Sequence, residues 1–149
     1  MRKSDKREEW ASRSEGETTR IATRMARTLR GGEAILLDGE LGAGKSVFVR
    51  GLAQGLGIRA RVTSPTFVLM RVYETTRTCP RFLVHVDAYR VRNAEELVAI
   101  GLMEWTGRPD SVVAIEWGER VAEIAHAATR IIRVRLTNVD AAQRMITLD

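Results

Sequence analysis

The chain has 149 residues, a length that fits one domain able to bury a core without disulfides. Its single cysteine, Cys79, excludes a disulfide framework and a multi-cysteine zinc site, and it fits a reducing compartment. The formal charge of +5 and the sequence pI of about 10.1 favour anionic partners, namely nucleotides, RNA or an acidic protein surface, although the arginines are scattered and not clustered.

The N-terminal segment, residues 1–13, is highly charged and lacks the apolar core of a signal peptide, so we expect a flexible tail. We expect the folded domain to span residues 14–149 and to be cytoplasmic, since no apolar run approaches the ~20 residues of a membrane-spanning helix. Ser14 and Glu17 have capping-box spacing, and apolar residues then recur every four positions. This pattern predicts a first helix over residues 18–30.

The rest of the chain alternates between strand-like and helix-like patterns. A continuous apolar run at 33–38 predicts a buried strand, and after a glycine-rich turn the four-residue period predicts a helix from about Lys45 to Leu56. Further strands are predicted at 66–74, 81–89, 111–117, 130–136 and 144–149, with a short helix at 93–102. This mixture predicts a single-domain, three-layer α/β/α fold whose mixed sheet is parallel around residues 33–38 and 111–116.

The glycine-rich turn carries the most specific signal. Residues 39–46, "GELGAGKS", match the pattern G-x-x-x-x-G-K-[ST] between a predicted strand and a predicted helix. Glycines let backbone N–H groups wrap a triphosphate, and the helix adds the partial positive charge of its N-terminus. The pattern predicts a P-loop NTPase in which Lys45 contacts the outer phosphates and the Ser46 hydroxyl ligates Mg²⁺. The predicted nucleotide contacts of the turn are Gly39, Leu41, Gly42, Ala43, Gly44, Lys45 and Ser46.

Two acids are candidates for the metal. Asp87 and Glu116 each end an apolar run, so each is expected at the carboxyl end of a strand, where α/β sheets bind ligands. Mg²⁺ commonly takes one or two carboxylates together with phosphate oxygens. Spacing does not rank the two acids, and either one can instead be an ordinary solvated residue.

Three other features can be functional or structural. The loop at residues 62–67 is rich in hydroxyl side chains, Thr66 among them, and either senses the γ-phosphate or is an ordinary turn. His85 lies inside an apolar strand and is interpreted as a core histidine rather than a catalytic one. Trp117 can contact the nucleotide or a partner, with core packing slightly favoured.

Several short motifs occur in one order with short gaps: "GELGAGKS", "TSPTF", "HVDAYR", "EEL" with "IGL", and "IEWGER". In this combination the chain resembles the bacterial TsaE/YjeE family, small ATPases required for tRNA threonylcarbamoyladenosine (t6A) biosynthesis. The likeness runs from about residue 14 to residue 149. It favours adenine as the base, as does the lack of a guanine-reading N/T-K-x-D motif.

The resemblance implies a Mg²⁺-dependent ATPase that works with two partner proteins. One is the catalytic subunit that transfers the threonylcarbamoyl group to adenosine 37 of tRNAs reading ANN codons, and the other is its inactive paralogue. The ATPase then resets this complex between turnovers, does not perform the transfer, and contacts tRNA only indirectly or transiently.

The resemblance also assigns roles to individual residues. It places Ser46 and Glu116 on the metal, Asp87 close to the phosphates, and Thr18 and Arg144 at the nucleotide, so that Lys45, Asp87 and Glu116 form the catalytic set. The chain departs from the family pattern where serine replaces the usual threonine at Ser46. It departs again at Gly118, where proline often follows the tryptophan and glycine should loosen the turn.

Two other functions are compatible with a P-loop. A small-molecule kinase needs an acceptor pocket and an arginine-rich lid, and residues 61–81 contain arginines but have a strand-like pattern. A nucleotide-sensing module that does not hydrolyse ATP differs from the ATPase only in turnover. Substituting Lys45 should abolish binding in either case, whereas substituting Glu116 should block turnover only in an enzyme.

Overall fold

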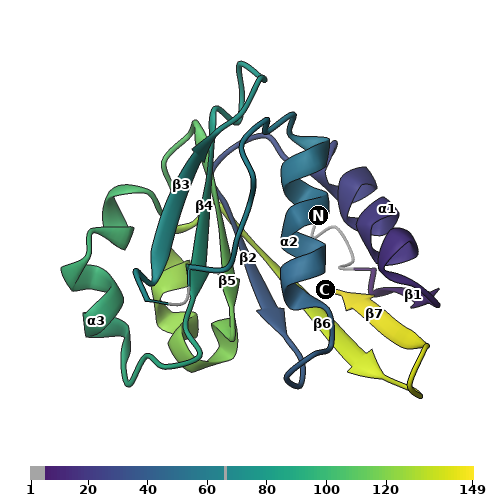
Figure 1. The fold of residues 1–149 in the computed structure, drawn as a ribbon. Helices are drawn as coiled ribbons and strands as arrows, with labels where there is room; N and C mark the ends of the chain where they lie inside the picture. Colours follow the sequence, from purple (N-terminus) through teal and green to yellow (C-terminus); the bar gives the residue numbers. More distant parts are fainter. Residues whose placement is uncertain (1–5, 66) are drawn as a thin grey trace.

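The computed structural model describes residues 6–65 and 67–149 as three layers, with one sheet between two sets of helices (Figure 1). The helices α1 (Glu15–Ala26) and α2 (Lys45–Gly55) cover one face of the sheet, and α3 (Ala94–Ala99) with the 3₁₀ segments η1 (Leu102–Glu104) and η2 (Gly118–Ala127) covers the other. The predicted α/β/α architecture is therefore confirmed. In the described part of the chain, no helix is long and apolar enough to cross a membrane.

The sheet has seven strands in the order β1-β7-β6-β2-β5-β4-β3. Strands β4, β5, β2 and β6 are mutually parallel, whereas β3, β7 and β1 extend the two sides by antiparallel pairs. The bounds are β1 (Glu8–Ser12), β2 (Glu33–Asp38), β3 (Met70–Glu74), β4 (Phe82–Asp87), β5 (Ser111–Glu116), β6 (Arg130–Asn138) and β7 (Arg144–Leu148). The predicted parallel pairing of 33–38 with 111–116 is confirmed.

The central strands are apolar on both sides because helices cover both faces of the sheet. In β2, Ile35 and Leu37 pack toward α1 and α2, while Ala34 and Leu36 pack toward α3 and η2. Since parallel strands end at the same edge, β2, β4 and β5 deliver their last residues side by side. Asp87 and Glu116 are register partners at this edge.

The tail predicted for residues 1–13 is wrong for residues 8–12. These residues form β1, which pairs antiparallel with β7 from Glu8 opposite Leu148 to Ser12 opposite Arg144. Trp10 packs against the core beneath α1. The first five residues lie outside the described part of the chain, as does Thr66 of the hydroxyl-rich loop.

Helices α1 and α2 touch closely through two glycines of α2. A Cβ at Gly51 would lie 2.6 Å from Ala22 Cβ, and one at Gly55 would lie 2.6 Å from Ala26 Cβ. The Thr23 hydroxyl also donates to the carbonyl of Gly51 at 3.0 Å. Small residues thus fix the position of α2, whose first turn carries the predicted phosphate contacts.

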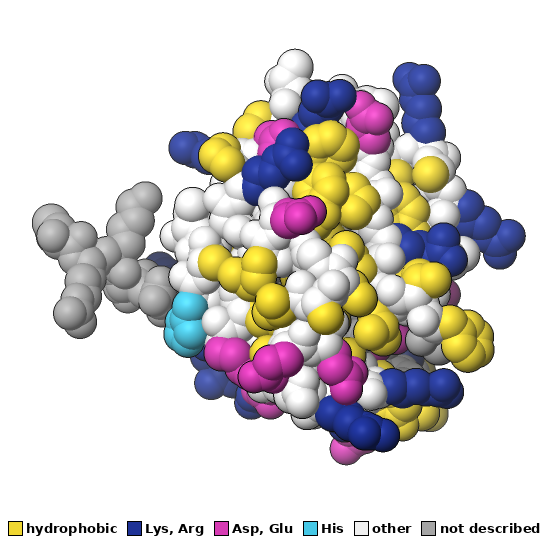
Figure 2. Space-filling view, turned by 90° about the vertical axis from the view of Figure 1, so that its left-hand side faces the viewer, with side chains coloured by type: hydrophobic (Ala, Val, Ile, Leu, Met, Phe, Trp, Pro, Cys, Tyr) yellow, Lys and Arg dark blue, Asp and Glu magenta, His cyan; other side chains and the backbone are white. Residues whose placement is uncertain are grey.

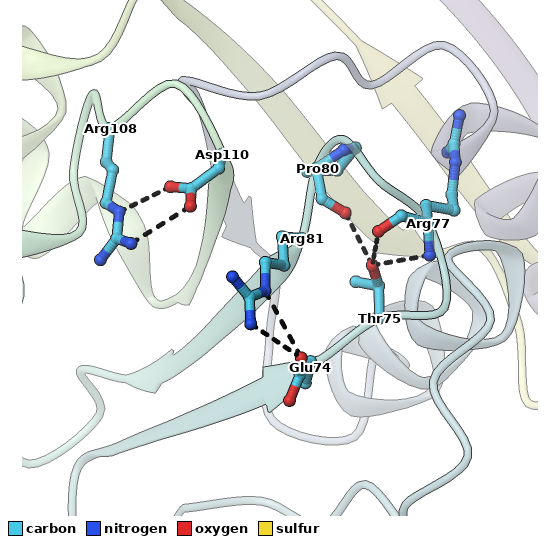
Figure 3. A network of polar contacts seen from close by, with 7 residues as sticks. All are labelled: Glu74, Thr75, Arg77, Pro80, Arg81, Arg108 and Asp110. Atoms are coloured by element: carbon cyan, nitrogen blue, oxygen red, sulfur yellow. Dashed lines mark hydrogen bonds and ion pairs between the residues drawn. The ribbon is translucent and has the colours of Figure 1, made fainter.

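A polar network stabilises the β3–β4 hairpin, which lies at the end of β4 opposite its carboxyl end (Figure 3). The Thr75 hydroxyl donates to the carbonyl of Pro80 at 2.7 Å, and Arg81 pairs with Glu74 at 3.3 Å. This network holds the start of β4, which ends at Asp87. The face on the α3 side carries apolar side chains among charged ones (Figure 2). Val98 of α3 and Met103 of η1 are among the exposed apolar side chains of the described residues.

Candidate nucleotide and metal site

The glycine-rich turn connects β2 to α2 at the carboxyl edge of the parallel strands. Gly39 has φ +152° and lies so close to β6 that a Cβ there would be 2.5 Å from the carbonyl oxygen of Leu136. Gly44 has φ +102° and is the N-cap of α2, with no side chain bonded to the first-turn N–H groups. Those N–H groups and the positive end of the helix form an anion-binding position.

Lys45, the first residue of α2, is buried beneath the turn. Its Nζ donates to the carbonyls of Gly39 at 2.6 Å and Glu40 at 2.9 Å, and it lies 4.1 Å from the ring centroid of Trp117. Burial lowers the pKa of Lys45, and the nearby Glu116 carboxylate opposes this most strongly. The ammonium is therefore held by weak carbonyl acceptors where a phosphate would be a stronger partner.

Ser46, Glu116 and His85 form a hydrogen-bonded chain across three elements. The Ser46 hydroxyl donates to Glu116 Oε1 at 2.9 Å and also lies 3.0 Å from the Ser64 hydroxyl. The second oxygen of Glu116 lies 2.6 Å from His85 Nε2. His85 is buried, as predicted, but it contacts the predicted metal acid, a partnership that sequence reasoning missed. Its position two residues before Asp87 was the available signal, because alternate residues share a face of a strand.

Asp87 and Arg144 lie on opposite sides of the turn. The Asp87 carboxylate accepts the backbone N–H of Tyr89 at 3.0 Å, which fixes it at the end of β4. Arg144, the first residue of β7, donates to the carbonyl of Gly42 at 3.2 Å. Its Nε is buried without a hydrogen-bond partner among the described residues, so one donor remains for a ligand.

A cavity of about 430 Å³ brings most of the predicted residues together. The predicted positions that line it are Leu41, Gly42, Gly44, Lys45, Ser46, Asp87, Glu116 and Arg144. Gly39 and Ala43 do not line this cavity: Gly39 lines a second one beside the turn, and Ala43 is fully buried in the core.

Thr18 does not line this cavity. It is buried in α1, and its hydroxyl lies 2.8 Å from that of Ser12 in β1. Glu15, at the start of α1, faces the cavity instead. The resemblance implies that Thr18 contacts the nucleotide, whereas in the structure its hydroxyl joins α1 to β1.

Aromatic and cationic side chains flank the turn on its other side. Trp117 has φ +60°, directly after β5, and its ring lies 5.1 Å from that of Tyr89 and 5.3 Å from the guanidinium of Arg120. With the turn, Trp117 and Arg120 line a second cavity of about 490 Å³. Gly118 is buried, and a Cβ there would lie 2.8 Å from Leu36 Cβ. Glycine therefore permits a close approach to β2 here, and the expectation that it loosens the turn stays a prediction.

The residues present fit a magnesium ion that is shared with a nucleotide. A serine hydroxyl and a glutamate oxygen lie 2.9 Å apart at the cavity that Asp87 also lines, and these are the hard oxygen donors that Mg²⁺ prefers. Within residues 6–65 and 67–149, no group of three or more His, Cys, Asp or Glu side chains could hold a metal. A metal at Ser46 and Glu116 would therefore complete its ligands with phosphate oxygens and water.

Comparison with known proteins agrees with this geometry. The family model described as "Threonylcarbamoyl adenosine biosynthesis protein TsaE" matches residues 12–146. A protein of Streptomyces coelicolor named tRNA threonylcarbamoyladenosine biosynthesis protein TsaE is 44% identical over 113 residues, 74% of each chain. A protein of that name from Treponema pallidum is 43% identical over 125 residues, 84% of this chain and 89% of its own. The crystal structure of Bacillus subtilis YdiB matches with a TM-score of 0.72 and 29% identity, covering 96% of this chain and 84% of that one. On these matches the chain belongs to the TsaE family of threonylcarbamoyladenosine biosynthesis proteins.

Proposed function

We propose that this protein is a Mg²⁺-dependent ATPase that supports threonylcarbamoylation of adenosine 37 in tRNAs reading ANN codons. The observation that carries the proposal is the convergence of Lys45, Ser46 and Glu116 on one cavity at the N-terminus of α2. The family membership supports the pathway, and the chemistry of these side chains supports the nucleotide and the metal.

Each side chain has a role in this proposal. Lys45 leaves the carbonyls of the turn for the outer phosphates, while Ser46 and Glu116 hold the metal. Bound Mg²⁺ supplies positive charge that offsets the charge of the transferring phosphate. Asp87 orients the attacking water from the end of β4, and Arg144 contributes its unpaired Nε donor to the nucleotide.

Hydrolysis by the chain alone should be slow. P-loop NTPases that lack an arginine directed at the γ-phosphate usually need a partner to complete the site. Among the cavity residues, Arg144 is held beside the turn by the carbonyl of Gly42 and Arg90 lies 5.9 Å from the Phe67 ring, so we assign neither to the γ-phosphate. We propose that the threonylcarbamoyl-transferase catalytic subunit and its inactive paralogue, in the cytoplasm, stimulate turnover, and that tRNA contact is indirect or transient.

A kinase function loses its main structural argument. The arginine-containing segment that could have served as a lid includes β3, a strand paired with β4 from Met70 opposite Val86 to Glu74 opposite Phe82. A strand that is part of the sheet is not free to close over an acceptor.

The test is ATP binding and turnover with and without the two partner proteins. Calorimetry should show ATP binding that tightens with Mg²⁺, and phosphate release should be slow until the partners are added. Lys45→Ala should abolish ATP binding. Fast turnover by the lone chain that the partners leave unchanged would overturn the proposed coupling, and Mg²⁺-dependent ATP binding without any hydrolysis would make the chain a nucleotide sensor.

A further inference from the structure

A buried histidine on β4 contacts the proposed metal acid from behind. His85 is 1% exposed and Glu116 is 4% exposed, and His85 Nε2 lies 2.6 Å from Glu116 Oε2. His85 does not line the cavity, so it cannot touch a nucleotide or a metal there. Its effect on the site must act through Glu116.

The contact with Glu116 indicates which ring nitrogen of His85 is the donor. The Glu116 carboxylate can only accept, so the His85 Nε2 proton is donated to it. The other ring nitrogen, Nδ1, is buried and has no partner among the described residues.

The two oxygens of Glu116 are held in different ways. Oε2 accepts from His85, whereas Oε1 accepts from Ser46, the residue proposed to share the metal with Glu116. Rotation of the carboxylate would break both contacts at once, so the bond to His85 fixes the plane in which Oε1 faces the cavity. Apolar packing alone does not need a histidine here, because Leu83, Val84 and Val86 of the same strand are fully buried without any polar group.

We propose that His85 is a positioning residue that orients Glu116 for the metal of the nucleotide complex. The inference rests on the proposed function, since it concerns the ion that Glu116 and Ser46 would hold with ATP. A partner behind a metal-ligating carboxylate fixes its orientation and raises metal affinity, and loss of such outer partners typically costs about 10–100-fold in metal affinity.

The test compares two amide replacements of His85 in the full chain. His85→Gln can place an amide N–H near the position of Nε2, whereas His85→Asn is too short to reach Glu116. Leu83→Val is the packing control, because Leu83 is buried on the same strand, faces α2 and takes no part in the site. Two quantities are measured, namely ATP affinity in EDTA by calorimetry and Mn²⁺ affinity by electron paramagnetic resonance with a non-hydrolysable ATP analogue.

The proposal predicts a loss specific to the metal. His85→Asn should weaken Mn²⁺ binding by about 10-fold or more and change ATP affinity in EDTA by less than about two-fold, while His85→Gln and Leu83→Val stay within about three-fold for both. The positioning role would be overturned if His85→Asn and His85→Gln weakened Mn²⁺ binding equally, or if His85→Asn left the Mn²⁺ affinity unchanged. If the unchanged chain binds neither ATP nor Mn²⁺, the proposed function itself fails.

Discussion

Replacing Glu116 with glutamine separates the charge of this side chain from its shape. Glu116 is buried, with Ser46 donating to one oxygen at 2.9 Å and His85 donating to the other at 2.6 Å. The glutamine oxygen can still accept from His85, and its NH₂ group can donate to the Ser46 hydroxyl, which is able to accept. Both contacts survive in neutral form, so the fold around the site should persist.

The expected magnitudes differ sharply between stability and activity. Each hydrogen bond to Glu116 loses its ionic part, about 1 kcal/mol per bond, while removal of a buried charge relieves a desolvation cost of several kcal/mol. The substitution also removes the charge that most favours the buried Lys45 ammonium, so these effects oppose one another and the metal-free protein should keep about the same stability. Loss of the anionic ligand should reduce Mg²⁺-dependent ATP turnover by about 100-fold or more, equivalent to about 2.7 kcal/mol of barrier.

The assay pairs phosphate release at saturating Mg²⁺ and ATP, with the partner proteins present, with urea denaturation of the metal-free chain. Glu123→Gln is the matched control, because it removes one exposed carboxylate of η2 that lines neither cavity. Turnover of Glu116→Gln within about ten-fold of the control would refute the role of the carboxylate in holding the metal. A large loss of stability would refute the argument that its charge is costly to bury.

Three further predictions concern the scaffold. Gly51→Ala should lower the free energy of unfolding by about 1 kcal/mol or more, because the new Cβ would lie 2.8 Å from the Thr19 carbonyl oxygen. The energetic cost of this overpacking exceeds the stability gained from the higher helix propensity of alanine. An unchanged denaturation midpoint would show that the two helices separate freely. Ser14→Ala should cost about 1 kcal/mol in the same assay by removing the N-cap of α1, and a change near zero would contradict it. Burial raises the pKa of Asp38, so its ionised form opposes folding above that pKa. Asp38→Asn can still accept from the N–H of Glu119, and it should raise the melting temperature at pH 7 by a gain that shrinks as the pH falls toward 3.8. A gain in melting temperature that does not depend on pH would contradict this reasoning.

The parts of the site that could be predicted from the sequence are those encoded by local motifs of a few consecutive residues. The turn at 39–46 has fixed spacing, and its flanking strand and helix have strong local patterns. Asp87 and Glu116 were predicted at one edge because each ends an apolar run, and their register confirms that edge. Local pattern and fold agree at all these positions, which is why the fold class could be predicted.

The parts that the sequence did not predict depend on contacts between distant segments. The short charged run at Glu8–Ser12 has no local strand signal, and it becomes a strand only because β7 offers a free edge. The close approach of α1 and α2 at Gly51 requires knowing that both helices pack on the same face of the sheet. Propensity and periodicity do not contain this information.

The chain from His85 through Glu116 to Ser46 shows how strongly the site depends on sheet register. Ser46 and Glu116 are 70 positions apart, Glu116 and His85 are 31 apart, and they meet because β4 and β5 pair with His85 opposite Ala114. A slip of one residue would move His85 to the other face of the sheet and break the bond to Glu116. The apolar rows of β2, β4 and β5 specify that register, so the buried core keeps His85 opposite Ala114 and within reach of Glu116.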